Sequence, residues 1–263
     1  MRGAGIAVLA IAMVLVGCAP RSVSRPNPAP AGTLPAAEAI FAALAQRREA
    51  VRAVRAVARL SYSAPDESHK VKQLLVAERP DRLRLEILSP FGAVFVLTTA
   101  DGTLAAWARE DATVYRGVAS RENLERYANV DLPVGTAVDL LLGTPPLHEK
   151  ADTVVSADAG AIELWQDLGD MVQVGWFNDR LEPLRYEQRE PSGAVRLRAG
   201  FGGYATIGGV AIPTQITIEL PVEQRRLDLV LSEPEVNPVL PNSVFALETP
   251  SGSRVVDLDQ GTQ

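Results

Sequence analysis

Apolar and polar residues alternate along most of the chain, with the period of two that is typical of β-strands with one dry face. In the clearest case, Leu83, Leu85 and Ile87 alternate with charged residues and lead to a corner at Ser89-Pro90-Phe91-Gly92. Proline and glycine favour a tight turn there, and an apolar return strand follows. Phe91 occupies the hairpin tip, which normally faces water. Its side chain therefore either folds back onto the core or enters an apolar partner.

The same alternation predicts strands through most of the remaining chain, separated by turn signals such as Asp101-Gly102, Asn178-Asp179 and Ser192-Gly193. The expected segments are 54–62, 71–78, 82–88, 93–99, 104–108, 112–116, 162–164, 172–176, 184–186, 195–201, 216–220 and 227–231. We therefore expect a mainly β (α+β) protein with about eleven antiparallel strands.

Helical periodicity occurs in two places. Residues 36–51 carry an apolar stripe that predicts one helix before the first strand. A helical insert is predicted at about 120–143, where Ser120 can cap a first helix and Pro133 suits the first turn of a second. Gly143 ends the second helix.

A sheet of this size with one continuous apolar face must pack on a second sheet or curl on itself. A curled sheet leaves interior space for a ligand, and the insert helices could cover its open side. A filled sandwich is the alternative, and the pattern alone does not separate the two. The same ambiguity applies to Trp176, whose ring is either core or cavity lining. The candidate cavity residues are Leu60, Leu83, Leu85, Ile87, Val138, Leu141, Leu142, Val174, Trp176, Leu197, Phe201, Ile216, Ile218 and Leu229.

The chain begins with Arg2 and an apolar run over 6–16, which is shorter than the about 20 residues that a spanning helix needs. The run ends at Leu15-Val16-Gly17-Cys18, which is similar to a bacterial lipobox. We expect a signal peptide over 1–17, lipidation of Cys18 and a proline-rich tether over 18–35. An ordinary secretory signal with a chance cysteine is the alternative. Cys18 is the only cysteine, so no internal disulfide can form.

Residues 36–263 are expected to form a single domain. The formal net charge of −6 argues against nucleic acid as a partner and against a broad electrostatic grip on anionic lipid.

Support for catalysis is poor. The two histidines, His69 and His148, lie far apart in polar sequence, and no motif for metal binding or for a serine nucleophile occurs. Residues 200–205 match the spacing of a dinucleotide-binding loop but interrupt strand-like sequence, so a bend in a curved sheet is expected instead. We expect no enzyme activity, no catalytic residue, no cofactor and no metal. The strand arginines Arg82, Arg84, Arg185, Arg196 and Arg198 are expected on the solvent face.

Four segments in order resemble the LolB family of outer-membrane lipoprotein receptors. Residues 81–85 leading to 89–92 are similar to that family's strand and N-P-L-G corner, and 138–143 resemble its helix that ends in Leu-Gly. Residues 201–204, followed by Ile212-Pro213, are similar to its Y-G-G-Y…P segment. The resemblance covers about 36–235.

The resemblance implies an unclosed antiparallel β-barrel with a helical lid and an apolar interior for acyl chains. It also implies that Phe91, flanked by Pro90 and Gly92, enters the membrane during delivery. A soluble periplasmic carrier is the implied protein partner, and we expect a monomer. Ala19 is not the aspartate associated with inner-membrane retention, so the outer membrane, with the domain facing the periplasm, is the expected location.

The chain departs from the family in two places. Phe91 stands where leucine is usual, and 240–252 look more like the soluble carriers of the superfamily. The leading hypothesis is a receptor that accepts lipoprotein acyl chains. The alternatives are a lipoprotein of this fold that binds phospholipid or glycolipid, and a structural or assembly lipoprotein with a filled core.

Overall fold

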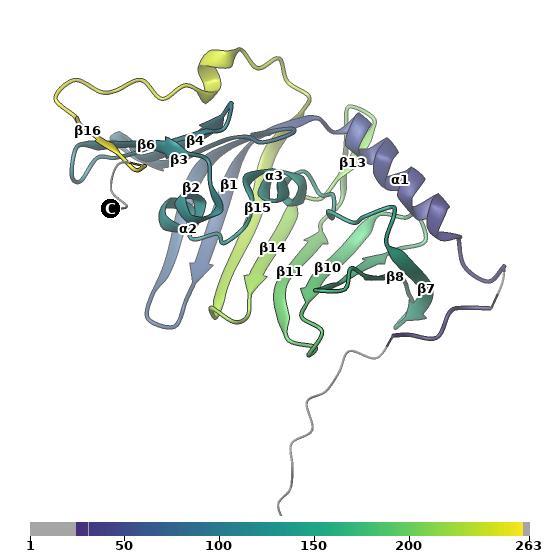
Figure 1. The fold of residues 1–263 in the computed structure, drawn as a ribbon. Helices are drawn as coiled ribbons and strands as arrows, with labels where there is room; N and C mark the ends of the chain where they lie inside the picture. The colour runs from purple at the N-terminus through teal and green to yellow at the C-terminus, as the bar shows by residue number, and fades with distance from the viewer. Residues whose placement is uncertain (1–24, 31, 260–263) are drawn as a thin grey trace, which may run out of the picture.

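The computed structural model describes residues 25–30 and 32–259, so the expected signal peptide and Cys18 lie outside the described residues. One fourteen-stranded sheet dominates the fold, in the order β16-β6-β5-β4-β3-β2-β1-β15-β14-β11-β10-β9-β8-β7 (Figure 1). A separate two-stranded hairpin, β12-β13, projects from it.

The elements have the following bounds. The helices are α1 (Ala37–Ala50), α2 (Arg121–Ala128), α3 (Val134–Leu141) and the short 3₁₀ helix η1 (Asn242–Phe245). The first half of the sheet contains β1 (Ala53–Ser63), β2 (Ser68–Glu78), β3 (Arg82–Ser89), β4 (Gly92–Ala100), β5 (Thr103–Ala108) and β6 (Thr113–Val118). The second half contains β7 (Asp152–Asp158), β8 (Ala161–Asp167), β9 (Val172–Phe177), β10 (Pro183–Arg189), β11 (Val195–Gly202), β14 (Gln215–Leu220) and β15 (Arg225–Val236). The remaining strands are β12 (Ala205–Ile207), β13 (Val210–Ile212) and β16 (Arg254–Asp257).

Antiparallel pairing connects all neighbours in the large sheet except β16, which adds to β6 in parallel. β1 pairs with β2 on one side and with β15 on the other, so the chain's first strand lies at the centre of the sheet and joins its halves. The register of β1 against β15 shifts between Arg55 and Val57, an irregularity that increases local twist and curvature.

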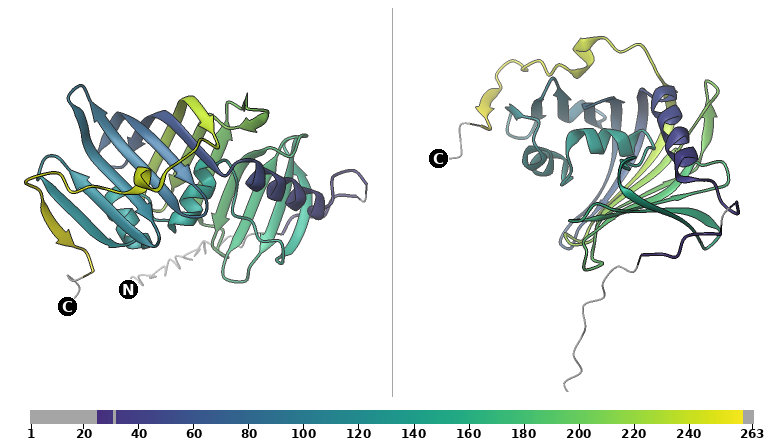
Figure 2. Two further views of the ribbon diagram at one scale, coloured as in Figure 1. Left: turned by 90° about the horizontal axis from the view of Figure 1, so that it is seen from above. Right: turned by 45° about the vertical axis from the view of Figure 1, so that its right-hand side comes forward.

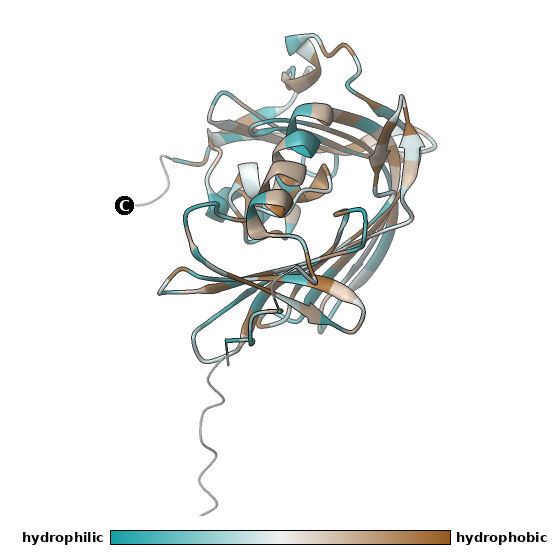
Figure 3. Cartoon of the chain, turned by 90° about the vertical axis from the view of Figure 1, so that its right-hand side faces the viewer, coloured by the Kyte–Doolittle hydropathy of each residue, from teal (hydrophilic) through white to brown (hydrophobic). Residues whose placement is uncertain are grey.

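The sheet curls around the helices without closing (Figures 2 and 3). Helices α2 and α3 lie in the concavity, and α1 packs Ile40 and Leu44 against Phe177 at the β7–β9 end. One apolar core connects the concave face of both halves with α2 and α3. The fold is therefore an unclosed antiparallel β-barrel with a helical lid, as the resemblance to the LolB family implied, and not the filled sandwich that the pattern alone left open.

Local signals gave accurate element boundaries. The predicted helix over 36–51 is α1, and Ser120 caps α2 by accepting a hydrogen bond from the Asn123 amide at 3.2 Å. Pro133 is the N-cap of α3 and lies one position before the first turn in which it was expected. The predicted strand number was too low, because β7, β12, β13 and β16 are edge or three-residue strands with little periodicity to detect.

The C-terminal segment, residues 237–259, runs across the convex face of the first half (Figure 2). Phe245 is only 3% exposed, and the Arg82 guanidinium lies 4.1 Å from its ring centroid. Arg84 donates a hydrogen bond to the Val244 carbonyl at 3.1 Å. The prediction that Arg82 and Arg84 face solvent is thus wrong: this segment covers them, and no alternation in the strands could reveal it.

Candidate functional site

An apolar cleft lies between the concave face of the first half and helix α2. It consists of two adjoining spaces of about 180 and 60 Å³. Both spaces contact Leu60, Gln73, Leu85, Ala128 and Leu227. The wider space is also lined by Tyr62, His69, Val71, Ile87, Phe95, Tyr127 and Asn129, and the narrower one by Leu75, Leu83, Leu124, Val130, Ala137, Leu141, Ile218 and Leu229.

Strand periodicity explains why the cleft is dry. Leu83, Leu85 and Ile87 of β3 occupy alternate positions and turn inward, while the charged residues between them turn outward. Leu75 of β2 is directly opposite Leu85 and is fully buried. The floor of the cleft is therefore aliphatic over neighbouring strands.

The lid helix α2 is held to the rest of the protein by weak polar contacts. Arg121 pairs with Asp131, and Arg225 pairs with Glu125 at 3.0 Å, in each case with at least one partner substantially exposed. Exposed ion pairs of this kind contribute about 0–1 kcal/mol each. The apolar contacts of Leu124 with the core are thus the main attachment of α2.

The cleft is smaller than the about 300–1,000 Å³ of typical ligand sites. A long hydrocarbon chain would therefore fit only if α2 moved away from the sheet. The weak polar attachment of α2 is consistent with such a movement.

The tip of the β3–β4 hairpin presents Phe91 to solvent, with 87% of the residue exposed. The turn itself is well braced: the Phe91 amide donates to Ser89 Oγ at 3.2 Å, and Arg109 donates to the Phe91 carbonyl at 3.2 Å. Gly92 has φ +99°, which strongly favours glycine. The Phe91 side chain does not fold back onto the core, so the first of the two alternatives left open by the sequence is excluded.

Phe91 lies at the same edge of the sheet as the mouth of the cleft. Tyr62 pairs with His69 at the end of the β1–β2 hairpin, and their rings stack at this mouth. The β3–β4 hairpin ends at that same edge, with Ile87 opposite Phe95 just inside the tip. An apolar path thus runs from the cleft toward the exposed phenyl ring.

Seven of the fourteen candidate cavity residues meet in this cleft: Leu60, Leu83, Leu85, Ile87, Leu141, Ile218 and Leu229. Four others belong to the same core without lining a described space, namely Val138, Leu142, Phe201 and Ile216. Leu197 lines a separate, more polar space of about 180 Å³ beside Arg121 and Asp131.

Val174 and Trp176 do not belong to the concave face. They form a separate cluster with Trp165, and Arg185 lies 3.7 Å above the Trp176 ring. All six residues of β9 are buried, so both faces of this strand are covered, although Gln173 lies on the concave one. Alternation therefore could not show which face turns inward, and the placement of these two residues in the cavity is wrong.

The convex face beside this cluster carries a buried carboxylate. Glu187 accepts hydrogen bonds from Arg198 at 2.8 Å and from Arg189 at 2.7 Å, and its side chain is 2% exposed. Burial opposes ionisation, but the two guanidinium groups outweigh it and lower the pKa of Glu187.

Tyr62, Phe95, Leu124, Tyr127 and Leu227 are cleft residues that were not among the candidates. Tyr62 and Leu227 share the inward register of Leu60 and Leu229, so continuing each alternation by one step would have found them.

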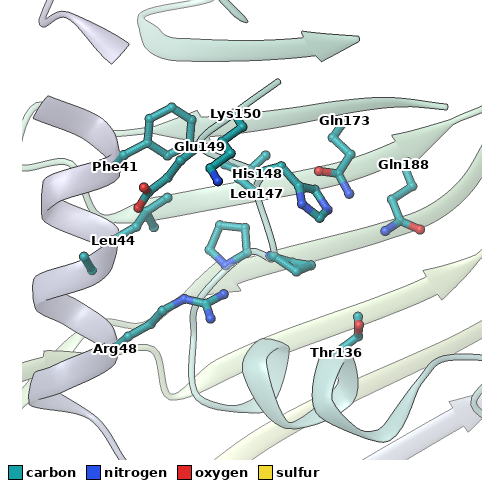
Figure 4. Close-up of a pocket in the computed structure, with 13 residues that line it drawn as sticks. Phe41, Leu44, Arg48, Thr136, Leu147, His148, Glu149, Lys150, Gln173 and Gln188 are labelled. Atoms are coloured by element: carbon teal, nitrogen blue, oxygen red, sulfur yellow. The ribbon is translucent and has the colours of Figure 1, made fainter. Parts of the chain in front are cut away.

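A second opening, of about 620 Å³, lies between α1 and the concave face of the second half (Figure 4). Its walls are Phe41, Leu44, Ala45 and Arg48 from α1, Thr136 from α3 and residues 145–150, and its floor is Gln173 and Gln188. We call this opening the glutamine groove. No pattern in the sequence indicated this opening.

Within the described residues, no cluster of three or more potential metal ligands occurs. None of the described helices combines the length and the apolar character needed to cross a bilayer. His69 and His148 are both exposed, at the mouth of the cleft and in the glutamine groove respectively.

No family profile and no curated protein matches the chain in sequence. Solved structures do match in fold. A putative outer membrane lipoprotein-sorting protein domain from Vibrio parahaemolyticus aligns with a TM-score of 0.54 at 14% identity, over 79% of this chain and 94% of that one. A LolA superfamily protein from Nitrosomonas europaea aligns with a TM-score of 0.53 at 12% identity, over 78% of this chain and 97% of that one.

The fold is similar to that of the LolA superfamily. A DUF1329 family protein from Desulfovibrio piger also has this LolA-like fold, with a TM-score of 0.53 at 13% identity over 80% of this chain and 96% of that one. The alignments span nearly the whole of each neighbour, so the likeness concerns the complete curled sheet. At these identities the LolA-like fold is what the comparisons show.

Proposed function

We propose that this protein is a lipid-anchored receptor that accepts acyl chains of lipoproteins in its apolar cleft and delivers them to the outer membrane from the periplasmic side. The observation that carries the proposal is the position of Phe91, exposed at the edge where the cleft opens. The LolA-like fold supports a carrier role, since one neighbour is described as a lipoprotein-sorting domain.

The energetic task is to shield hydrocarbon from water. Exposing a 16-carbon chain costs on the order of 12 kcal/mol at about 0.8 kcal/mol per methylene. Leu60, Leu83 and Leu85 offer an apolar floor for such a chain. Outward movement of α2 would supply the volume. No bond needs to be broken, so binding and release suffice.

Delivery requires a contact between the cleft and the bilayer. The acidic chain has no general attraction for anionic lipid, so an apolar side chain is the suitable contact. Phe91, between Pro90 and Gly92, would enter the acyl region and open a path from the cleft. We further propose that acylated Cys18 and the tether keep the monomeric domain at the membrane, where a soluble periplasmic carrier hands over the cargo.

Transfer kinetics test the role of Phe91. The Cys18→Ser chain, which keeps every described residue, would be loaded with a fluorescent fatty acid and mixed with phospholipid vesicles. Phe91→Glu should bind the probe as wild type does, because the side chain lies outside the cleft, and should lose most of the transfer rate. The matched control is Val239→Glu, since Val239 is 94% exposed but follows the β15 end at the opposite edge of the sheet.

Transfer by Phe91→Glu at the wild-type rate would show that the corner does not act at the membrane. A binding assay with the same probe, competed by a triacylated lipopeptide, tests the cargo. Identification of co-purifying lipids by mass spectrometry separates lipoprotein cargo from phospholipid or glycolipid cargo.

A further inference from the structure

Helix α3 divides the interior of the curled sheet into two chemically different spaces. Ala137 and Leu141 face the apolar cleft, whereas Thr136 faces the glutamine groove. At about 620 Å³ the groove already has the volume of a ligand site. It therefore needs no movement of the lid to admit a small molecule.

The floor of the groove, Gln173 and Gln188, belongs to a row of three glutamines on adjacent strands. Gln166 of β8 is directly opposite Gln173 of β9, which is opposite Gln188 of β10. The side chain of Gln166 holds the backbone of His148. Its oxygen accepts a hydrogen bond from the His148 backbone amide at 3.0 Å, and its nitrogen donates one to the His148 carbonyl at 2.5 Å. Gln188 donates to the Tyr186 hydroxyl at 2.8 Å.

The Gln173 side chain also hydrogen-bonds to Tyr186, but its oxygen has no hydrogen-bond partner among the described residues. Gln173 is only 2% exposed and lines the groove. An unpaired buried acceptor is costly, and native proteins rarely retain one without a role. The groove thus presents an acceptor suited to a ligand's hydroxyl or amine donor.

Positive charge gathers at the groove in a protein whose net charge is negative. Arg48 and Arg79 share the single carboxylate of Asp139, so this group of three side chains carries one net positive charge. Lys150 lines the groove without an ion pair to any described residue (Figure 4). Glu149 is the one acidic side chain in the lining. Apolar Phe41 and Leu44 flank these charges.

We propose that the glutamine groove is a second binding site, which takes the headgroup of an anionic phosphoglyceride. A headgroup hydroxyl would donate to Gln173 Oε1, the phosphate would lie near Lys150 and Arg48, and the first methylenes of the chains would contact Phe41 and Leu44. This site is separate from the acyl cleft and does not depend on the function proposed above.

Calorimetric titration of the Cys18→Ser chain with dihexanoyl-phosphatidylglycerol, below its micellar concentration, tests the site. Gln173→Leu should weaken binding about tenfold, the effect expected for one buried hydrogen bond. Lys150→Gln, an exposed position that tolerates substitution, should weaken it several-fold. Dihexanoyl-phosphatidylcholine, which lacks a headgroup donor, should bind more weakly than the glycerol lipid to wild type. Glycerophosphoglycerol tests whether the headgroup alone suffices.

Ala128→Phe, which fills the apolar cleft, is the matched control and should leave phosphatidylglycerol binding unchanged. The proposal is overturned if Gln173→Leu and Lys150→Gln both bind phosphatidylglycerol as wild type does, or if the glycerol and choline lipids bind equally. Loss of acyl-probe binding with retained headgroup binding would count against the receptor function alone.

Discussion

The two halves of the curled sheet use opposite chemistry on the same concave face. In the first half the inward positions of β1–β3 are mainly apolar, with Gln73 as a buried polar exception, and are closed over by α2. In the second half Gln173 and Gln188 turn inward, while apolar Val174 and Trp176 turn outward. One strand architecture thus provides a dry cleft and a polar groove, depending only on which residues take the inward register.

The boundary between the halves is held by a partly buried ionic cluster. Asp139 of α3 accepts from Arg48 of α1 at 2.8 Å and pairs with Arg79 at the β2–β3 corner. Arg79 also donates to Thr144 Oγ1 at 2.9 Å. Burial lowers the pKa of Arg79 to about 10, so the guanidinium stays protonated at neutral pH. This cluster fixes α3 between the two spaces.

Breaking the ionic cluster around Asp139 should have the largest effect on stability. Asp139→Ala leaves two guanidinium groups without their carboxylate and should lower the free energy of unfolding by about 4 kcal/mol. Denaturant titration measures the loss. Glu49→Ala, which breaks the exposed Glu49–Arg52 pair, is the control and should cost at most about 1 kcal/mol. Equal losses in the two variants would contradict a structural role for the cluster.

On the convex face of the first half, the packing of the C-terminal segment can be tested at Phe245. Phe245→Ala should cost about 3 kcal/mol, because it removes the ring that the C-terminal segment buries against Arg82. Hydrogen exchange should show faster exchange in β16 and no change in β9. Unchanged protection of β16 would mean that Phe245 does not anchor the segment.

The convex face of the second half depends instead on Glu187. The pKa of Glu187 is lower in the folded than in the unfolded chain. Its ionised carboxylate therefore stabilises the fold fully at pH values above the unfolded-state pKa, and this stabilisation is lost as the pH falls through the folded-state pKa. Glu187→Gln should therefore cost about 2 kcal/mol at neutral pH. That difference should shrink toward pH 3, which unfolding curves at several pH values can show. A stability difference between wild type and Glu187→Gln that does not change with pH would contradict the conclusion that Glu187 is ionised in the folded protein.

The smallest effect is expected at the outer edge of the second half. Arg25 pairs with Asp152 of β7, and the Ala29 amide donates to the Val155 carbonyl at 2.9 Å. Arg25→Ala should leave the free energy of unfolding almost unchanged, because the pair is exposed. It should nevertheless speed proteolysis within 25–36 if this contact holds the tether on the sheet. Proteolysis at the wild-type rate would show that Arg25 does not restrain it.

The contrast between the halves also explains what could be predicted from the sequence. The β3–β4 hairpin and α2 were predicted accurately because turn residues, a cap and short-range periodicity specify them. The cleft residues of β1 and β3 followed from alternation. The orientation of β9 did not follow, because its apolar face of Val174 and Trp176 is buried on the convex side, whereas alternation places an apolar face toward the core. The glutamine row depends on cross-strand register, and the path of 237–259 depends on tertiary contacts, neither of which one sequence reveals.

Binding of a fluorescent fatty acid to wild type, Ala128→Phe and Gln173→Leu tests the central claim most directly. Ala128 lines both parts of the apolar cleft, so a phenyl ring there should fill it and weaken probe binding at least about tenfold. Gln173→Leu should bind the probe as wild type does. Undiminished binding by Ala128→Phe, or the absence of binding by wild type, would contradict the assignment of the first-half cleft as the acyl site.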